Sequence, residues 1–428
     1  MVEDEIIIME EIEKSKSELV DLTLTLGNIY SPTGHEGDMM KFVYRWMEER
    51  GFNPCLIGPS PDRANVLGKL RGTGKGFSIT FNSHMDVTMG KNEIWRLRMP
   101  EQKIFYEAWL EGDTIYGNGV VNDKGPLACW LIAADAIRKC GLQLKGDILL
   151  AAVIGEIGPE PVDEFIGSAY LGKDFGTHYL LTHGGTTDFA IVAEATNFKP
   201  GWVEAGKAFF KITVFAGPSR YTPYIEHPEN PLASSNAIVH SGVLILALEK
   251  WAREYSKRNT RSYAGGTVIP KASLGAIRGG LPYQIIRPPE VCHLYLDVRI
   301  LPGVNPLDIR QELCALLEEV GVDGEVEIYL HRPGYEAKGI EPLIADLQKA
   351  YKMVSGEELT LRADPPVTSM WRDTNCYAEF NIPTITYGPG GGAGGGVNAI
   401  TIEELVRAAK IYALLAYYLG QRERQAIS

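Results

Sequence analysis

Three short apolar stretches, each ending near a polar residue, constrain the fold of this chain more than any other feature. The stretches are residues 77–82, 147–154 and 189–193. Their length is typical of buried strands, and longer segments with helical patterns separate them. This alternation predicts an α/β layer structure with a mixed, largely parallel sheet flanked by helices. Because open α/β sheets bind ligands beyond the carboxyl ends of their strands, His84, Glu156 and Glu194, which follow the stretches within two residues, predict a functional site there.

The length and composition describe a globular protein. The chain has 428 residues, enough for two or three domains, and its 45% hydrophobic and 22% charged residues are ordinary for that class. A formal net charge of −12 disfavours nucleic acids and anionic membranes as partners. The six cysteines form no C-x-x-C pair, no apolar run approaches the ~20 residues of a membrane span, and the N-terminus is acidic where a signal peptide is basic. We therefore expect a cytoplasmic protein with free thiols.

Residues 205–332 have a different pattern and predict a second domain. Strand and helix patterns alternate there over residues 206–214, 232–257, 292–300, 306–319 and 324–331. Two strand–helix–strand units of this kind indicate a small α+β, ferredoxin-like insert. The first domain then consists of residues 1–204 and 333–428, and its helices are expected near residues 3–28, 37–50 and 402–419.

Several polar motifs, taken in order, resemble those of a known enzyme family. The motifs are His84-Met85-Asp86, Gly117-Asn118-Gly119-Val120-Val121-Asn122-Asp123-Lys124-Gly125, Ile154-Gly155-Glu156-Ile157-Gly158, Ala193-Glu194 and Gly388-Pro389-Gly390. Over about residues 15–420 the chain resembles the two-metal exopeptidase and deacylase family that includes carnosinase, aminoacylase, acetylornithine deacetylase and succinyl-diaminopimelate desuccinylase. The resemblance implies a metal-dependent hydrolase acting on carbon–nitrogen bonds. It also implies a lid and dimerisation domain at residues 205–332, and therefore a homo-oligomer, a dimer or larger.

His84, Asp86 and Glu194 match the family's motifs. In the family the histidine binds a metal, and the aspartate two residues later orients it, since an acceptor on the second ring nitrogen fixes an imidazole ligand. Glu194 stands where the family has an acidic ligand of the first metal. A carboxylate that closes a buried strand needs a partner, which a metal supplies.

Asn122 is the first departure from the family. The family usually has an aspartate there that bridges both metals, whereas a neutral amide oxygen neutralises two close dications poorly. Asn122 and Asp123 also suit the N-cap of a helix that is expected to begin near Pro126. Asp123 can alternatively supply the missing carboxylate, so the choice between Asn122 and Asp123 stays open.

Gly155 and a missing histidine are further departures. The family has two successive glutamates, the first a general base and the second a ligand of the second metal. Here Gly155 aligns with the base and Glu156 with the ligand, so either Glu156 acts as the base or the reaction has no such base. The family also has a histidine ligand after its Gly-Pro-Gly turn, but no histidine follows His331 in this chain.

These departures lead to a one-metal interpretation. His84, Asn122 and Glu194 remain as ligands of one divalent metal, with Asp86 and Glu156 as the catalytic residues. One anionic ligand instead of two predicts weaker metal binding and a stronger Lewis acid. Mixed nitrogen and oxygen ligands suit manganese or zinc, with cobalt and iron as alternatives.

Substrate binding has weaker signals. The candidates are Trp371, Arg372, Arg220, Tyr221, His227 and Arg287. A guanidinium such as that of Arg372 binds a carboxylate with two N–H groups, and an indole stacks on a flat ring. Arg220 or Tyr221 stands where the family has a lid histidine, with His227 nearby, and Arg287 lies in a segment that approaches the site in the family. We therefore expect a small carboxylate-bearing substrate.

The replacement of these metal ligands and of the base resembles the aminohydrolase branch that converts 5-nitroanthranilate to 5-nitrosalicylate and ammonia. In that reaction the nitro group accepts the negative charge, so no carbonyl oxyanion has to be stabilised. The resemblance implies that this chain releases ammonia from a carboxylate-bearing aromatic amine. Two alternatives stay open: a conventional two-metal amidohydrolase of the aminoacylase or dipeptidase type, and a catalytically inactive binding protein.

Overall fold

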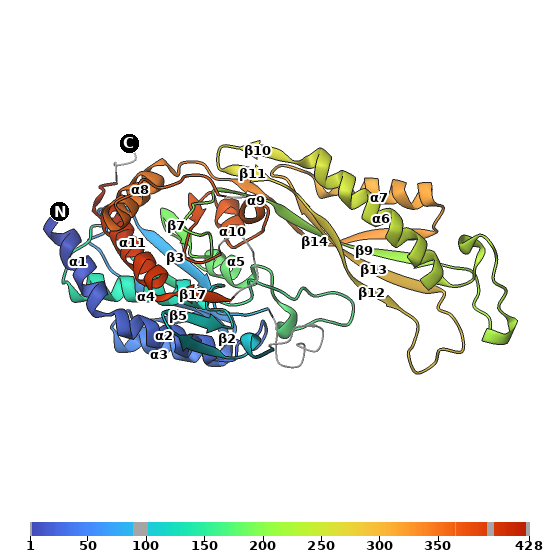
Figure 1. Ribbon diagram of the computed structural model, residues 1–428, viewed down its shortest axis with the longest axis horizontal. Coiled ribbons are helices and arrows are strands. Elements are labelled where there is room, and N and C mark those ends of the chain that lie inside the picture. The colour runs from blue at the N-terminus through green and yellow to red at the C-terminus, as the bar shows by residue number, and fades with distance from the viewer. Residues whose placement is uncertain (1, 89–101, 364, 392–397, 425–428) are drawn as a thin grey trace. The chain divides into compact units, whose positions relative to one another are not determined.

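Figure 1 shows the computed structural model, which describes residues 2–88, 102–363, 365–391 and 398–424. The chain forms two compact units. Unit 1 comprises Met1–Trp202, Ala337–Ala363 and Arg372–Ser428, and unit 2 comprises Val203–Glu336 and Asp364–Trp371. The boundaries expected from the sequence differ mainly at one place, because residues 365–371 join unit 2 instead of the C-terminal part of the first domain.

Unit 1 is built on a six-stranded sheet. Its strands, in spatial order, are β1 (Cys55–Ser60), β2 (Arg63–Leu70), β6 (Ile148–Val153), β3 (Ile79–His84), β7 (Phe189–Val192) and β16 (Thr384–Thr386). The last four are parallel, whereas β1 and β2 pair antiparallel with their neighbours. Every residue of β3, β6 and β7 is buried, as expected for a parallel sheet covered on both faces. The predicted mixed, largely parallel α/β sheet is therefore confirmed.

Helices flank this sheet (Figure 1). They are α1 (Val2–Lys14), α2 (Lys16–Asn28), α3 (Gly37–Glu49), α4 (Lys124–Lys139), α5 (Phe175–Thr182), α8 (Glu341–Ser355), α10 (Thr374–Glu379) and α11 (Ile402–Gln421). The single helix expected over residues 3–28 is two helices that meet at Ser15. All residues of α4 from Lys124 to Ile137 are buried, and α4 contacts β3, β6 and α11. A small antiparallel sheet completes the unit, with β4 (Ala108–Glu111), β5 (Thr114–Gly117) and β17 (Ala399–Thr401).

The parallel strands of unit 1 end at one edge of the sheet. β3 ends at His84, the turn with Glu156 follows β6, and Glu194 follows β7. α4 begins at Lys124, directly after Asn122 and Asp123, and packs against β3. The register of the sheet makes the ends of β3, β6 and β7 neighbours. Polar residues from separate parts of the sequence therefore lie close together there.

Unit 2 has an antiparallel sheet in the order β12-β13-β9-β14 with two helices packed on it. Along the chain the elements are β9 (Gly206–Phe215), α6 (Ala237–Asn259), β12 (Ala272–Gly279), β13 (Val291–Ile300), α7 (Pro306–Val320) and β14 (Gly324–Arg332). This β-α-β-β-α-β order is that of a ferredoxin-like fold, as predicted. Two short strand pairs flank it: β8 (Val203–Glu204) with β15 (Tyr335–Glu336), and β10 (Arg261–Tyr263) with β11 (Gly266–Val268).

Short helical turns make up the remaining regular structure. They are η2 (Gln102–Phe105), η3 (Ser168–Tyr170), η4 (Thr222–Tyr224), η5 (Pro231–Ala233) and α9 (Pro365–Thr368). Within the part of the chain that the structure describes, none of the helices has the length and apolar character needed to cross a membrane.

Candidate metal centre

His84 is the centre of a buried polar cluster. Its side chain is 1% exposed, and Nδ1 lies 2.9 Å from the backbone carbonyl oxygen of Asp86, to which it donates. Nε2 lies 2.7 Å from Oδ1 of Asn122 and 3.9 Å from Oε2 of Glu156. Since a neutral ring with its proton on Nδ1 has only a lone pair on Nε2, that lone pair faces two acceptor oxygens. A proton or a metal ion between them removes the conflict.

Glu156 and Glu194 complete the cluster. Ligand atoms of His84, Glu156 and Glu194 all lie within 4.8 Å of one another, and all three side chains are buried. No other such group of His, Cys, Asp or Glu occurs among the described residues. One imidazole and two carboxylates suit a divalent transition metal. Asn122 is exposed to solvent beside them, so the cluster has an open side.

The carboxylate of Asp86 mainly accepts hydrogen bonds from backbone N–H groups. Its carboxylate accepts hydrogen bonds from the Thr33 hydroxyl (2.6 Å) and from the N–H groups of Glu156 (3.1 Å) and Ile157 (3.1 Å). Its distance to His84 Nδ1 is longer, 3.5 Å. Burial alone raises the pKa of Asp86, but the hydrogen bonds and charge that stabilise the anion outweigh burial and lower its pKa to about 2. The backbone carbonyl of Asp86 thus makes the shorter contact with His84, while the carboxylate lies near Nδ1 and also holds the turn that carries Glu156.

Asp123 lies beside His84 and is fully buried. Its Oδ2 accepts a long hydrogen bond from the His84 N–H (3.4 Å), and Oδ1 has no hydrogen-bond partner among the described residues. Asp123 occupies the N-cap position of α4, yet its side chain makes no capping hydrogen bond, so the expected capping role is wrong for this residue. Burial raises the pKa of Asp123 well above its ordinary value, assisted by the charges of Glu194 and Glu156. A cation bound at the cluster would therefore stabilise the anionic form of Asp123, which burial disfavours.

Arg372 pairs with Glu194 inside the cluster. Its Nε donates to Oε2 of Glu194 at 2.5 Å, and the two side chains are 3% and 5% exposed. The sequence offered Arg372 as an anchor for a substrate carboxylate. The structure shows instead that a carboxylate of the protein itself accepts from this guanidinium.

The sequence analysis missed Asp373, which follows Arg372. Asp373 is buried, accepts from the Thr177 hydroxyl at 2.7 Å through Oδ2, and has no partner at Oδ1 within the described chain. Burial raises its pKa well above the ordinary value, and the charge of Glu156 adds to the effect. An aspartate between Arg372 and the start of α10 was the only available sign, because its proximity to Glu156 depends on the fold.

The other candidate substrate residues belong to unit 2. Trp371 is buried, and the Lys207 ammonium lies 3.3 Å from its ring centroid, so the ring is not an open stacking surface as expected. Tyr221 and His227 are exposed in the segment after β9. Arg287 is also exposed and lines a cavity of about 300 Å³ within unit 2. For Tyr221, His227 and Arg287 a role in substrate binding stays a prediction.

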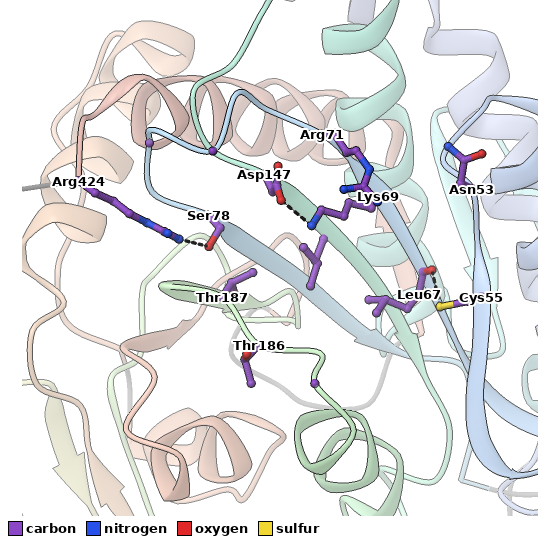
Figure 2. Close-up of a pocket in the computed structure, with 14 residues that line it drawn as sticks. Asn53, Cys55, Leu67, Lys69, Arg71, Ser78, Asp147, Thr186, Thr187 and Arg424 are labelled. Atoms are coloured by element: carbon purple, nitrogen blue, oxygen red, sulfur yellow. Dashed lines mark hydrogen bonds and ion pairs between the residues drawn. The ribbon is translucent and has the colours of Figure 1, made fainter. Parts of the chain in front are cut away.

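A larger cavity of unit 1 lies away from the cluster. Ser78 lines this cavity just before β3 begins (Figure 2), whereas His84 ends the same strand. The volume of the cavity is about 460 Å³. Two of its cations are already neutralised, Lys69 by Asp147 at 2.5 Å and Arg424 by Asp188. The cavity therefore lies at the opposite edge of the sheet and has no part in the chemistry of the cluster.

The affinity of the cluster for a metal is expected to rise with pH. Burial alone lowers the pKa of His84, but the carboxylates of Asp123, Asp86 and Glu156 outweigh it and raise that pKa well above its ordinary value. Below the raised pKa a metal must displace the proton on Nε2, so affinity increases about tenfold per pH unit until His84 is neutral. Calorimetric titration with Zn²⁺ in buffers of different ionisation enthalpy measures the released proton directly. An affinity that does not change across neutral pH would contradict this assignment.

Gly155 has a backbone conformation and a space that only glycine fits. Its φ is +60°, and a Cβ would lie 2.7 Å from the carbonyl oxygen of Leu171 and 3.0 Å from the Arg63 guanidinium. The Gly155 N–H donates to Glu36 Oε1 (3.1 Å), and Glu36 forms a buried ion pair with Arg63 at 2.8 Å. These contacts fix the turn before Glu156, and Gly155 stands where the resembling family has the first of its two glutamates.

Replacing Gly155 by alanine is therefore expected to lower the free energy of unfolding by about 1–3 kcal/mol. Gly112 is the matched control, because its φ is +63° but no atom lies within 4 Å of its Cβ position. Gly112→Ala has only the backbone penalty, so the difference between the two variants measures the crowding at Gly155. Equal losses in chemical denaturation would show that the Leu171 carbonyl moves away freely.

Known proteins are similar to this chain along nearly its whole length. An N-formyl-4-amino-5-aminomethyl-2-methylpyrimidine deformylase of Bacillus subtilis (strain 168) is 26% identical over 444 residues, with 94% of this chain and 95% of that protein covered. A LysW-lysine/LysW-ornithine hydrolase of Saccharolobus islandicus (strain M.16.4) is 24% identical over 418 residues and covers 97% of this chain and 100% of its own.

The fold is shared with a solved dipeptidase, Dug1p from Saccharomyces cerevisiae, at a TM-score of 0.73 and 12% identity, with 99% of this chain and 100% of that chain covered. Residues 80–418, which are most of the chain, match the family described as Peptidase family M20/M25/M40. The chain therefore belongs to this family of metal-dependent hydrolases, which act on carbon–nitrogen bonds.

Proposed function

We propose that this chain hydrolyses the amide bond of a small N-acylated amine, with one divalent metal held by His84, Asn122 and Glu194 and with Glu156 as the base. The observation that carries the proposal is the buried group of His84, Glu156 and Glu194, in which Nε2 of His84 lies 2.7 Å from Oδ1 of Asn122 and 3.9 Å from Oε2 of Glu156. A metal bound there supplies Lewis acidity toward water and the amide carbonyl. Manganese or zinc is the preferred metal for these ligands.

Glu156 is suited to carry protons. It is buried, and desolvation, together with the charge of Glu194, raises its pKa above the ordinary value, which brings a carboxylate closer to the range useful for a base. The N–H groups of Glu156 and Ile157 are fixed by Asp86, so the turn does not depend on the metal for its position. In this role Glu156 takes a proton from the attacking water and delivers it to the departing amine.

The similar proteins favour amide hydrolysis over the release of ammonia from 5-nitroanthranilate, which was expected because several of the family's metal ligands and its base are replaced. One is named a deformylase and the other a hydrolase of LysW-linked lysine and ornithine, and neither name describes the loss of an aromatic amino group. Amide hydrolysis, which the sequence analysis left open as the reaction of a two-metal amidohydrolase, therefore becomes the main proposal, here with a single metal. The carboxylate-bearing substrate loses support, since Arg372 pairs with Glu194.

A panel of substrates tests the proposal. The metal-loaded protein is assayed for amine release from N-formyl aromatic amines and N-acyl amino acids, and for ammonia release from 5-nitroanthranilate. Amine release that stops on chelation and returns with added metal supports amide hydrolysis. Ammonia release from 5-nitroanthranilate without turnover of any amide would return the protein to the aminohydrolase reaction.

We also propose that the chain forms a homo-oligomer through unit 2. Strand β12 lies at the edge of its sheet and exposes most of its residues. Ile238, Val239 and Leu246 of α6 are 43%, 37% and 75% exposed. Exposed apolar side chains beside an unpaired strand edge are a common basis for association. Sedimentation analysis of the full chain measures the number of subunits.

A further inference from the structure

We propose that the guanidinium of Arg372 is a built-in cation that restricts the centre to a single metal by engaging one oxygen of Glu194. The inference rests on the proposed function, because it concerns the same cluster of His84, Glu156 and Glu194. It differs from a substrate-binding role for Arg372, and it explains the number of metals from residues of this chain.

The contact itself is the first argument. Nε of Arg372 donates to Oε2 of Glu194 at 2.5 Å, across 178 positions of sequence, and both side chains are almost fully buried. Charge-assisted hydrogen bonds between a guanidinium and a carboxylate are strong. With Oε2 engaged, Glu194 has Oε1 left for a metal, so it is poorly placed to chelate one ion with both oxygens or to serve two ions at once.

The position of Arg372 is fixed by its backbone. Its N–H donates to Oδ1 of Asn375 at 3.3 Å, and the N–H of Asn375 donates to its carbonyl oxygen at 3.0 Å. These bonds form the turn that leads into α10. Because the turn is closed by protein atoms, the guanidinium is held at Glu194 by the fold and does not depend on a bound substrate.

Charge is the third argument. Asp123, Glu156 and Glu194 are buried acidic groups that lie around His84. A guanidinium keeps its positive charge at any pH the protein experiences. Arg372 therefore places a permanent positive charge beside Glu194, and this charge repels a second divalent ion there.

The charge of Arg372 can be separated from its hydrogen bond with two variants. Arg372→Lys keeps the positive charge, while Arg372→Gln keeps an N–H donor near Glu194 and removes the charge. The affinity for Zn²⁺ is measured on the full chain by competition with a chromophoric chelator, and the metal content by elemental analysis after saturation. Thermal unfolding in chelator reports whether each variant is folded.

Whether the Zn²⁺ affinity rises or falls in R372Q shows whether Arg372 restricts metal binding. We expect R372Q to bind Zn²⁺ at least about tenfold more tightly than the unchanged protein and to take up more than one ion per chain. R372K should keep one ion and an affinity close to that of the unchanged protein. Weaker or unchanged binding in R372Q, or tighter binding in R372K, would overturn the proposal, since Arg372 would then only position Glu194.

The same measurements keep this inference separate from the proposed function. If the unchanged protein binds no metal, the proposed function fails before Arg372 is considered. If it binds one ion and R372Q does the same with equal affinity, only the role of Arg372 is lost. Two ions in the unchanged protein would overturn the inference while leaving metal-dependent amide hydrolysis in place.

Discussion

Replacing His84 by alanine is expected to abolish amide hydrolysis and to lower metal affinity by more than about 100-fold. The imidazole is the only nitrogen ligand of the proposed centre, and its Nε2 faces both Asn122 and Glu156. Without the imidazole, the neighbouring carboxylates lack the nitrogen ligand that completes the metal site. Elemental analysis and turnover measured on the same preparation show whether metal and activity are lost together.

His183→Ala is the control for this variant. His183 is exposed at the end of α5 in the same unit, and its contacts are local, with Tyr179 and Thr182. It should keep full metal content and activity. Thermal unfolding in chelator distinguishes a His84 variant that has lost its metal from one that has lost its fold. A folded His84→Ala protein with undiminished hydrolysis would rule out the metal centre described above.

Replacing Glu156 by glutamine is expected to lower kcat by about 10²–10⁴-fold while the metal content stays near that of the unchanged protein. The amide is nearly the same size and keeps an acceptor oxygen near His84, but it cannot take up a proton at neutral pH. Glu111→Gln, on the exposed end of β4, removes the same charge from unit 1 away from the cluster and should have no effect. Metal content and kcat are measured together.

The outcome for Glu156→Gln also resolves a question that the sequence left open. If the variant loses the metal as well as activity, Glu156 is a ligand and another group moves the proton. Asp123 and Asp373 are the nearest alternatives, because both are buried carboxylates that interact electrostatically with Glu156. If the metal stays and activity falls, Glu156 is the base.

The sequence predicted the features that depend on local pattern. Buried strands of apolar residues, each followed by a polar one, indicated that His84, Glu156 and Glu194 meet at the ends of β3, β6 and β7, and the structure brings them within 4.8 Å. The order of strands and helices also predicted the ferredoxin-like arrangement of unit 2. In both cases the periodicity of a single segment fixes which face is buried, and the topology follows from a small set of allowed connections.

Side-chain pairing over long sequence distance was not predictable. The contact between Arg372 and Glu194 depends on how the turn before α10 meets the end of β7, which no local pattern encodes. Trp371 suggested an open aromatic surface, but Lys207 lies over its ring. The carboxylate of Asp86 lies near His84, as expected, but its hydrogen bonds to the turn of Glu156 were not predicted. Each side chain had several plausible partners, and only the packed structure selects among them.

The left-handed turn at Gly155 also bears on how this protein can change over evolutionary time. Two adjacent glutamates would need a change of one codon, but the side chain at position 155 would collide with the Leu171 carbonyl and disturb the Arg63–Glu36 pair. The first step of that path is therefore unfavourable until the segments carrying Leu171 and Arg63 have been rebuilt. Substitutions at the solvent-exposed side of the cluster are therefore more accessible to this protein than the introduction of a second acid at position 155.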